Sequence, residues 1–173
     1  MTRANRDIFA ASERLMSMDE AAWARHANPL SVYSRFTALP LLTLAIWSRD
    51  WLGIWCLVPI ALSLLWIWWN PRAFGPPADT QSWAARGTLG ERVFLNRHAE
   101  PIPAHHSAWA YGLTMVSAVG LIPWVYGLWS LDLFATLLGL VVIIGGKTWF
   151  VDRMVWLYQD MKDSNPDYAG WSR

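Results

Sequence analysis

The sequence contains very little cysteine and none of the best-known catalytic motifs. Its one cysteine, Cys56, lies inside an apolar stretch; this excludes an internal disulfide and a cysteine-rich zinc framework, and favours a small core residue. The sequence has no GxSxG elbow, no phosphate-binding glycine loop, no HExxH and no CxxCH. The best-known routes to a hydrolase, a nucleotide enzyme, a zinc protease and a c-type cytochrome are therefore unsupported.

Net charge is also low. The chain has 14 Lys and Arg against 13 Asp and Glu, a net charge of +1, whereas binding to nucleic-acid phosphates needs a concentrated basic surface. The first residues, "MTRANRDIFAASERL", interleave acidic side chains and hold no continuous apolar stretch, so they lack the core of a cleavable signal peptide. We therefore expect no nucleic-acid partner and a chain that is inserted whole.

Apolar residues, in contrast, are abundant. They make up 54% of the 173 residues, with 14 tryptophans and a mean hydropathy of +0.20. They form four blocks near the roughly 20 residues that cross a bilayer: about Leu30–Trp47, Trp51–Trp69, Trp109–Trp129 and Leu133–Val151. The second and third blocks contain no charge. The sequence thus predicts an all-α membrane protein with four transmembrane helices.

The links between these blocks predict two tight hairpins and their orientation. Only "SRD" separates the first two blocks and only "SLD" the last two, so both hairpin tips should lie on one side of the membrane. Of the 14 Lys and Arg residues, only Arg49 is at a tip. The positive-inside rule then places both termini in the cytoplasm. We expect a multi-pass protein of the bacterial inner membrane.

Matching landmarks in the two halves predict an internal duplication within a single membrane domain, residues 1–173. The chain has "RHANPL" at 25–30 and "RHAEPI" at 97–102, preceded by "SMDE" and "TLGE", which fit the capping box that starts a helix. After each hexapeptide come "WSRD" or "WSLD" and then "WWNPR" or "WFVDR". We expect repeats at about 17–72 and 88–153, arranged as parallel-repeat hairpins.

Two further stretches have the pattern of cytoplasmic amphipathic helices. Asn5–Met16 places apolar residues at helical spacing. The central segment between the hairpins should form a helix along the membrane surface, with Trp83, Val93 and Phe94 facing lipid.

Histidines form the candidate metal site. His98, His105 and His106, with Glu100 between them and His26 completing the site, supply imidazole and carboxylate groups that suit iron or zinc. "HAEPIPAHH" faintly resembles a histidine box of the membrane desaturases and hydroxylases, but that family uses about eight histidines and this chain has four. The alternatives are ordinary interfacial histidines or a proton-linked role.

Basic residues at the ends of the apolar blocks form the second candidate site. These side chains can anchor a span and set its topology, or bind anionic lipid headgroups. The candidates are Arg25, Arg97, Arg72, Arg153 and Lys147. Lys147 lies near the end of the fourth block and can extend its side chain to the interface.

"RHANP" together with "KTWFVDRMVWLYQDM", Lys147 to Met161, resembles the small four-span bacterial membrane proteins grouped as families of unknown function. The resemblance implies membrane location and span count, and no activity. Our first hypothesis is a non-catalytic protein whose cytoplasmic Arg and His side chains bind anionic lipid or a partner protein. The alternatives are a metal-dependent membrane enzyme acting on a lipid-soluble substrate, of oxidoreductase or hydroxylase type, and a small transporter that works as an oligomer.

Overall fold

The computed structural model describes residues 20–171, in which all of the regular secondary structure is helical and there is no strand. The expected amphipathic helix Asn5–Met16 and most of the "SMDE" capping box lie outside the described residues. The chain divides into two compact units. The first unit comprises residues up to Val32 together with Pro71–Ala108 and Val151–Arg173; the second comprises Tyr33–Asn70 and Trp109–Phe150. We call them the polar unit and the apolar unit, because their surfaces differ in these properties.

Within residues 20–171, three helical segments are long and apolar enough to cross a membrane: Pro29–Ala73, Ala104–Ser130 and Leu133–Met161. The second is α8 and the third is α9. The first is a helical run interrupted by short breaks, with α3 (Pro29–Arg35), α4 (Ala38–Trp47), α5 (Arg49–Leu52), the 3₁₀ turn η2 (Gly53–Cys56) and α6 (Leu57–Ala73).

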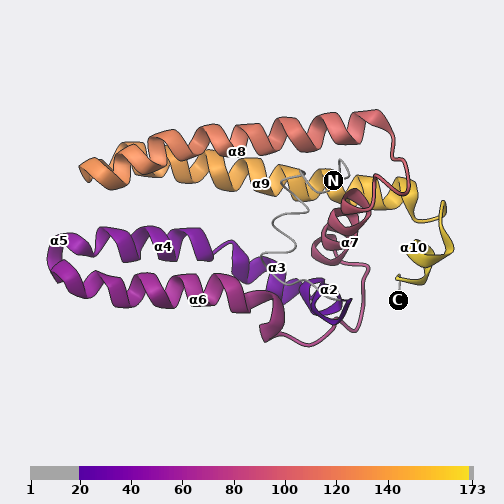
Figure 1. Cartoon of the computed structure of the whole chain (residues 1–173), viewed down its shortest axis with the longest axis horizontal. Coiled ribbons are helices and arrows are strands. Elements are labelled where there is room, and N and C mark those ends of the chain that lie inside the picture. The colour runs from indigo at the N-terminus through magenta and orange to yellow at the C-terminus, as the bar shows by residue number, and fades with distance from the viewer. Residues whose placement is uncertain (1–19, 172–173) are drawn as a thin grey trace, which may run out of the picture. The chain divides into compact units, whose positions relative to one another are not determined.

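The run Pro29–Ala73 folds back on itself around α5 and η2 (Figure 1). Asn70 Nδ2, near the end of α6, donates a hydrogen bond to Ser34 Oγ of α3 at 2.7 Å, so the two ends of the run meet. Gly53 makes the reversal with φ +55°, in the left-handed region that favours glycine. The reversal thus extends beyond the "SRD" tripeptide to Cys56, which is buried.

Helices α8 and α9 form the second hairpin of the apolar unit and pack closely along their length (Figure 1). Glycines allow this approach: a Cβ on Gly139 would lie 2.5 Å from Trp124 of α8, and one on Gly146 would lie 2.5 Å from Ser117 Oγ. Small residues let helix backbones pack where burial of apolar surface from water supplies no driving force. Asp132 starts α9 as its cap, because its carboxylate accepts a hydrogen bond from the Ala135 N–H at 2.9 Å.

Side chains of the first hairpin tie it to the second within the apolar unit. The Trp124 indole N–H donates to Thr43 Oγ1 of α4 at 3.0 Å. At the tips, the Arg49 guanidinium donates to the carbonyl oxygens of Leu128 and Trp129, the latter at 2.9 Å. These carbonyls belong to the last turn of α8, where helix acceptors lack an intrahelical partner. Both hairpin tips therefore lie at the same end of the apolar unit.

The polar unit is a small helical assembly with a buried core. It contains α2 (Glu20–His26), α7 (Trp83–Leu95), the last turns of α9 and α10 (Pro166–Gly170). Helix α7 crosses α9 at very close range, since a Cβ on Gly90 would overlap the backbone of Met154. Two buried tyrosines close the core near the C-terminal end: Tyr158 Oη donates to the Tyr168 carbonyl at 3.1 Å.

Two expectations for the central segment are wrong. Ser82, and not Thr88, caps α7: Ser82 Oγ accepts from the Ala85 N–H, whereas the Thr88 hydroxyl lies inside the helix and donates to the Ala84 carbonyl. Val93 and Phe94 do not face lipid, because they are 0% and 1% exposed. They belong to the core of the polar unit. A row of apolar side chains on one face of a helix has the same sequence pattern whether that face packs on protein or on lipid.

Candidate functional site

Histidines and a carboxylate meet inside the polar unit. His105 and His106 occupy the first turn of α8, which begins at Ala104 directly after the Pro101–Pro103 stretch. Proline disfavours helix at the residue before it, so this stretch delays the helix until the histidine pair. The backbone N–H of His106 donates to the Pro103 carbonyl at 3.1 Å. The start of α8 thereby fixes the backbone of both histidines.

Asp160, in the last turn of α9, is the carboxylate that meets them. His106 Nε2 lies 2.9 Å from Asp160 Oδ2. The imidazole is 3% exposed, whereas the carboxylate is 51% exposed, so the pair joins a buried group to one that water and ions can reach. The other ring nitrogen of His106, Nδ1, is buried and has no hydrogen-bond partner among the described residues.

His105 completes a group of three donors. The ring centroids of His105 and His106 are 4.1 Å apart, and His105 is exposed. One ligand atom from each of His105, His106 and Asp160 lies within 4.8 Å of the others. Two imidazoles and one carboxylate form a donor set that zinc, iron and other first-row transition ions accept.

The remaining members of the candidate metal site lie outside this group. Glu100 Oε2 instead accepts a hydrogen bond from Asn165 Nδ2 at 3.2 Å. His98 is exposed. His26 is buried at the end of α2, where its ring meets Trp23 edge-on at 5.6 Å between centroids. Of the five residues selected from the sequence, the structure brings together His105 and His106.

Asp160 was missed because it is remote in sequence from the histidines. The signal that could have found it is the hairpin itself. Helices α8 and α9 are antiparallel arms that start from the tip at Leu131, so residues at similar distances before and after the tip lie near one another. His106 is the 25th residue before Leu131, and Asp160 is the 29th after it. The difference is about one helical turn.

The basic candidates are in varied surroundings. Arg97 packs its guanidinium over the Phe94 ring at 4.0 Å and donates to the Phe94 carbonyl. Arg153 lies 3.2 Å from Asp152 Oδ2, and Asp152 also accepts from the Trp83 indole N–H. Lys147 Nζ lies 4.4 Å from the centroid of the Phe150 ring.

The other two candidates, Arg72 and Arg25, lie in helices α6 and α2. Arg72 is in the last turn of α6 and is half-buried, and Arg25 in α2 has a buried Nε with no hydrogen-bond partner among the described residues. Of the five basic candidates, Arg72 lies in α6, Lys147 and Arg153 lie in α9, Arg25 lies in α2, and Arg97 follows the end of α7.

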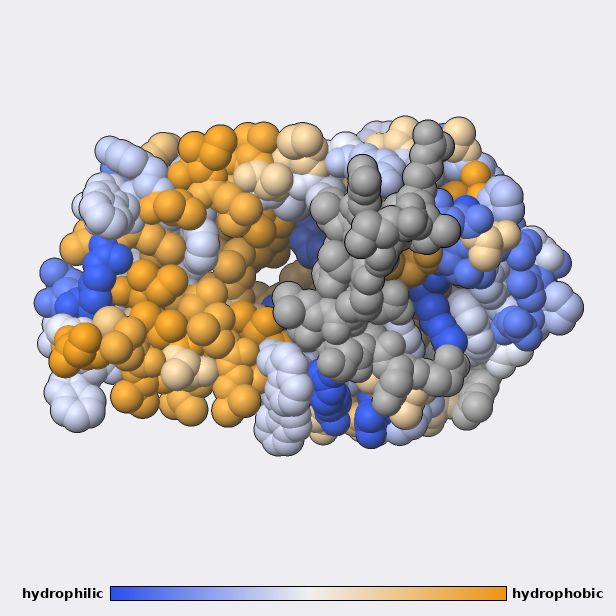
Figure 2. Space-filling view, in the orientation of Figure 1, coloured by the Kyte–Doolittle hydropathy of each residue, from blue (hydrophilic) through white to orange (hydrophobic). Residues whose placement is uncertain are grey.

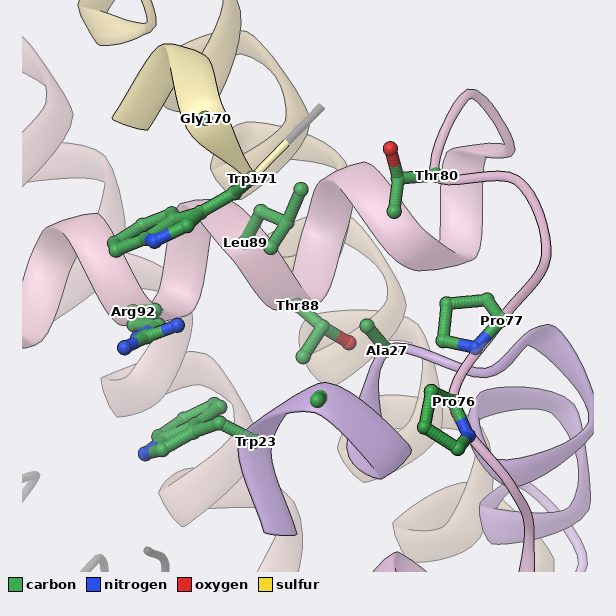
Figure 3. Close-up of a pocket in the computed structure, with 11 residues that line it drawn as sticks. Trp23, Ala27, Pro76, Pro77, Thr80, Thr88, Leu89, Arg92, Gly170 and Trp171 are labelled. Atoms are coloured by element: carbon green, nitrogen blue, oxygen red, sulfur yellow. The ribbon is translucent and has the colours of Figure 1, made fainter. Parts of the chain in front are cut away.

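A pocket of about 240 Å³ also opens in the polar unit, between α2, α7, α10 and the segment that precedes α7 (Figure 3). Its polar lining residues are Thr80, Thr88 and Arg92, and the Arg92 guanidinium lies 4.1 Å from the centroid of the Trp171 ring. Figure 3 shows Arg92 between the indoles of Trp171 and Trp23. The cavity is smaller than the roughly 300–1,000 Å³ of typical ligand sites. Its described lining contains no histidine, carboxylate or cysteine, so the histidine–aspartate group is the stronger chemical site.

These features define a class of protein: its described residues form helices and no strand, three helical segments among them have the length and composition of membrane spans, and a small polar helical unit accompanies them. The chain belongs to the family of unknown function DUF6653, whose family model matches residues 10–173. No curated protein and no solved structure matches the chain.

Proposed function

We propose that the chain is a four-span integral membrane protein of the bacterial inner membrane, which binds anionic lipid headgroups at basic residues next to its span ends. The observation that carries the proposal is the outward-facing apolar surface of the apolar unit. The exposed large hydrophobic side chains of the described residues all belong to this unit, except Leu30 and Trp156. Figure 2 shows the corresponding hydrophobic surface over these helices. In water such a surface would aggregate, whereas in a bilayer it is the expected lipid-facing surface.

Span lengths support four crossings and not three. Helices α3 and α4 together run from residue 29 to 47, which is about 28 Å of helix, and the 17 residues of α6 give about 25 Å. Each is close to the roughly 30 Å of hydrocarbon in a bilayer. Because Ser34 and Asn70 meet at 2.7 Å, the run Pro29–Ala73 enters and leaves on one side in this proposal.

Exposed tryptophans support the same placement, because tryptophan is enriched at both membrane interfaces. One set lies at or near the hairpin tips: Trp51, Trp55 and Trp129. The other lies at the opposite ends of the helices: Trp68, Trp69, Trp109 and Trp149. Arg72 follows Trp69 by three residues and Arg153 follows Trp149 by four, which sets both guanidinium groups at headgroup depth.

Of the basic candidates, Arg72, Arg153 and Lys147 carry the proposed lipid contacts. Arg72 lies in α6, and Lys147 and Arg153 lie in α9, whereas Arg25 lies in α2 and Arg97 follows α7, outside the helices of membrane length, so we assign Arg25 and Arg97 a smaller contribution. A juxtamembrane Lys or Arg near an anionic surface contributes about 1 kcal/mol. The contributions of these basic residues to lipid binding should therefore be additive, and binding should weaken as the salt concentration rises.

Cysteine labelling tests the topology. In a Cys56→Ser background, single cysteines replace Asp50 and Asp132 at the tips and Ala78 and Ser164 in the polar unit. A membrane-impermeant maleimide should label the first two in intact cells and the last two only after lysis. A three-span protein would instead leave position 50 unlabelled inside the membrane, while positions 78 and 164 would still share one side because two spans separate them.

Thermal unfolding in vesicles tests the lipid contacts. The protein should unfold at a higher temperature in phosphatidylglycerol vesicles than in phosphatidylcholine vesicles, and Arg72→Gln with Arg153→Gln should remove most of that gain. Lys162→Gln, an exposed basic residue beyond α9, is the matched control and should keep the gain. An equal gain in the double variant would overturn the lipid proposal and leave the topology standing.

A further inference from the structure

We propose that His105, His106 and Asp160 bind one divalent first-row transition-metal ion. This site goes beyond membrane insertion and lipid binding, and it rests on the geometry of the polar unit alone. All three side chains belong to that unit, from the first turn of α8 and the last turn of α9.

Separations between the donor atoms fit a shared ion. Metal–ligand bonds of about 2.0–2.2 Å to imidazole nitrogen and carboxylate oxygen place neighbouring ligand atoms about 3 Å apart. His106 Nε2 and Asp160 Oδ2 are 2.9 Å apart. All three donors lie within 4.8 Å of one another, and His105 is exposed, so rotation of its side chain can bring it into ligand range.

Burial of His106 supplies a second, independent observation. Burying an imidazole costs free energy unless a polar group or an ion compensates it. His106 is 3% exposed, and because its Nδ1 has no hydrogen-bond partner among the described residues, Nε2, which faces Asp160, is the ring nitrogen that an ion in this group would bind. Its one described side-chain contact with a charged group is Asp160, which is the group that would share the ion.

Ligand chemistry sets the class of ion. Two neutral imidazoles and one carboxylate carry a net charge of −1, which a divalent cation compensates. Imidazole favours zinc, iron, cobalt and nickel, whereas calcium and magnesium prefer sets made entirely of oxygen. Three protein ligands also leave at least one coordination position for water or another ligand, as in catalytic zinc sites and in iron sites with two histidines and one carboxylate.

Titration of the metal-stripped protein tests the site. The full chain is purified in detergent without a polyhistidine tag and titrated with Zn²⁺ by calorimetry and with Co²⁺ by visible absorption. We expect one ion per chain, with Mg²⁺ and Ca²⁺ unable to compete. Absence of Zn²⁺ binding, or binding displaced equally by Mg²⁺, would overturn the proposal.

Substitutions assign the ligands. His105→Ala and Asp160→Asn change exposed side chains, so they should leave the helical circular dichroism intact and weaken Zn²⁺ binding at least about 10-fold, the lower end of the loss seen when even a supporting residue of a metal site is removed. His106→Gln should weaken it further. The change in the Co²⁺ spectrum should accompany each loss, which a merely structural role would not produce.

Matched controls separate this site from adventitious binding. His98→Ala removes an exposed histidine outside the group, Glu100→Gln removes the carboxylate nearest to the histidines in sequence, and Asp163→Asn removes an exposed carboxylate just beyond α9. All three should retain wild-type affinity. Equal weakening by His98→Ala and His105→Ala would show surface histidine binding and sink the proposed site.

Discussion

The polar unit buries most of its large apolar side chains, whereas the apolar unit exposes most of its own. Leu157 of α9 is 0% exposed in the polar unit, and Leu62 of α6 is 61% exposed in the apolar unit. Charged residues, in contrast, are concentrated in the polar unit. The apolar unit has few charged residues: Arg35, Arg49, Asp50, Asp132 and Lys147. The same residue types are thus buried in one unit and exposed in the other, as expected if the apolar unit faces lipid as we propose.

The two units also differ in what holds their helices together. In the polar unit, removal of apolar surface from water stabilises the core by about 25 cal/mol per Å². Lipid offers no such gain, so helices in a bilayer associate through close packing and interhelical hydrogen bonds. The glycines between α8 and α9 and the Trp124–Thr43 hydrogen bond supply these contacts in the apolar unit. If the apolar unit faces lipid as we propose, its exposed leucines are in an apolar environment, as are the buried leucines of the polar unit.

Truncating one leucine in each unit should give the largest contrast. Leu157→Ala removes a fully buried side chain and should cost about 2–5 kcal/mol. Leu62→Ala removes a side chain that has few protein contacts and should cost less than about 0.5 kcal/mol. Thermal unfolding in detergent, followed by circular dichroism, measures both. Equal costs would break the comparison between the units.

Adding one methyl group at the crossing of α7 and α9 should give the next largest effect. Gly90→Ala puts a Cβ onto the backbone of Met154, so the helices must separate, at a cost of about 1–3 kcal/mol. Gly112→Ala in α8 is the control: its Cβ meets nothing within 4 Å, and alanine favours helix. Limited proteolysis of the polar unit should accelerate only in the first variant. An unchanged rate would mean that α7 does not pack tightly on α9.

Removing the hydrogen bond between the hairpins should have a moderate effect. Thr43→Val and Trp124→Phe should each destabilise the apolar unit by about 0.5–1.5 kcal/mol. Because both changes remove the same bond, the double variant should lose less than the two single losses added together. A double-mutant cycle of unfolding temperatures in detergent measures this. Strict additivity would show that the bond contributes nothing.

Among the variants that remove a described contact, Lys147→Met should have the smallest effect. The ammonium group lies over the Phe150 ring at 4.4 Å, an arrangement that contributes about 0.5–1 kcal/mol at exposed sites. Methionine keeps most of the apolar length of the side chain, so the variant should insert and fold normally. Expression level and membrane fraction should match the wild type. Failure to insert would assign Lys147 a role deeper in the membrane than interfacial anchoring.

Several features of the fold were predictable because they depend on local pattern. Charge-free apolar stretches indicate the long helices α8 and the first part of α9, and the pair of short links indicates reversals near Asp50 and Asp132. The number of crossings and the internal repeat stay predictions. The helical run Pro29–Ala73 has breaks that composition alone did not locate, because Gly53 acts through its backbone conformation.

The two histidines of the candidate metal site were predictable from the sequence, and its carboxylate was not. The sequence by itself determined that the chain is helical, that its apolar stretches suit a membrane and that His105 and His106 are candidate ligands, because these properties belong to residue types and short-range spacing. Tertiary structure decided that Asp160, and not Glu100, meets the histidine pair, and that Val93 and Phe94 face a protein core. These outcomes depend on which helices pack together. His106 and Asp160 are 54 residues apart, and only the antiparallel course of α8 and α9 makes them neighbours.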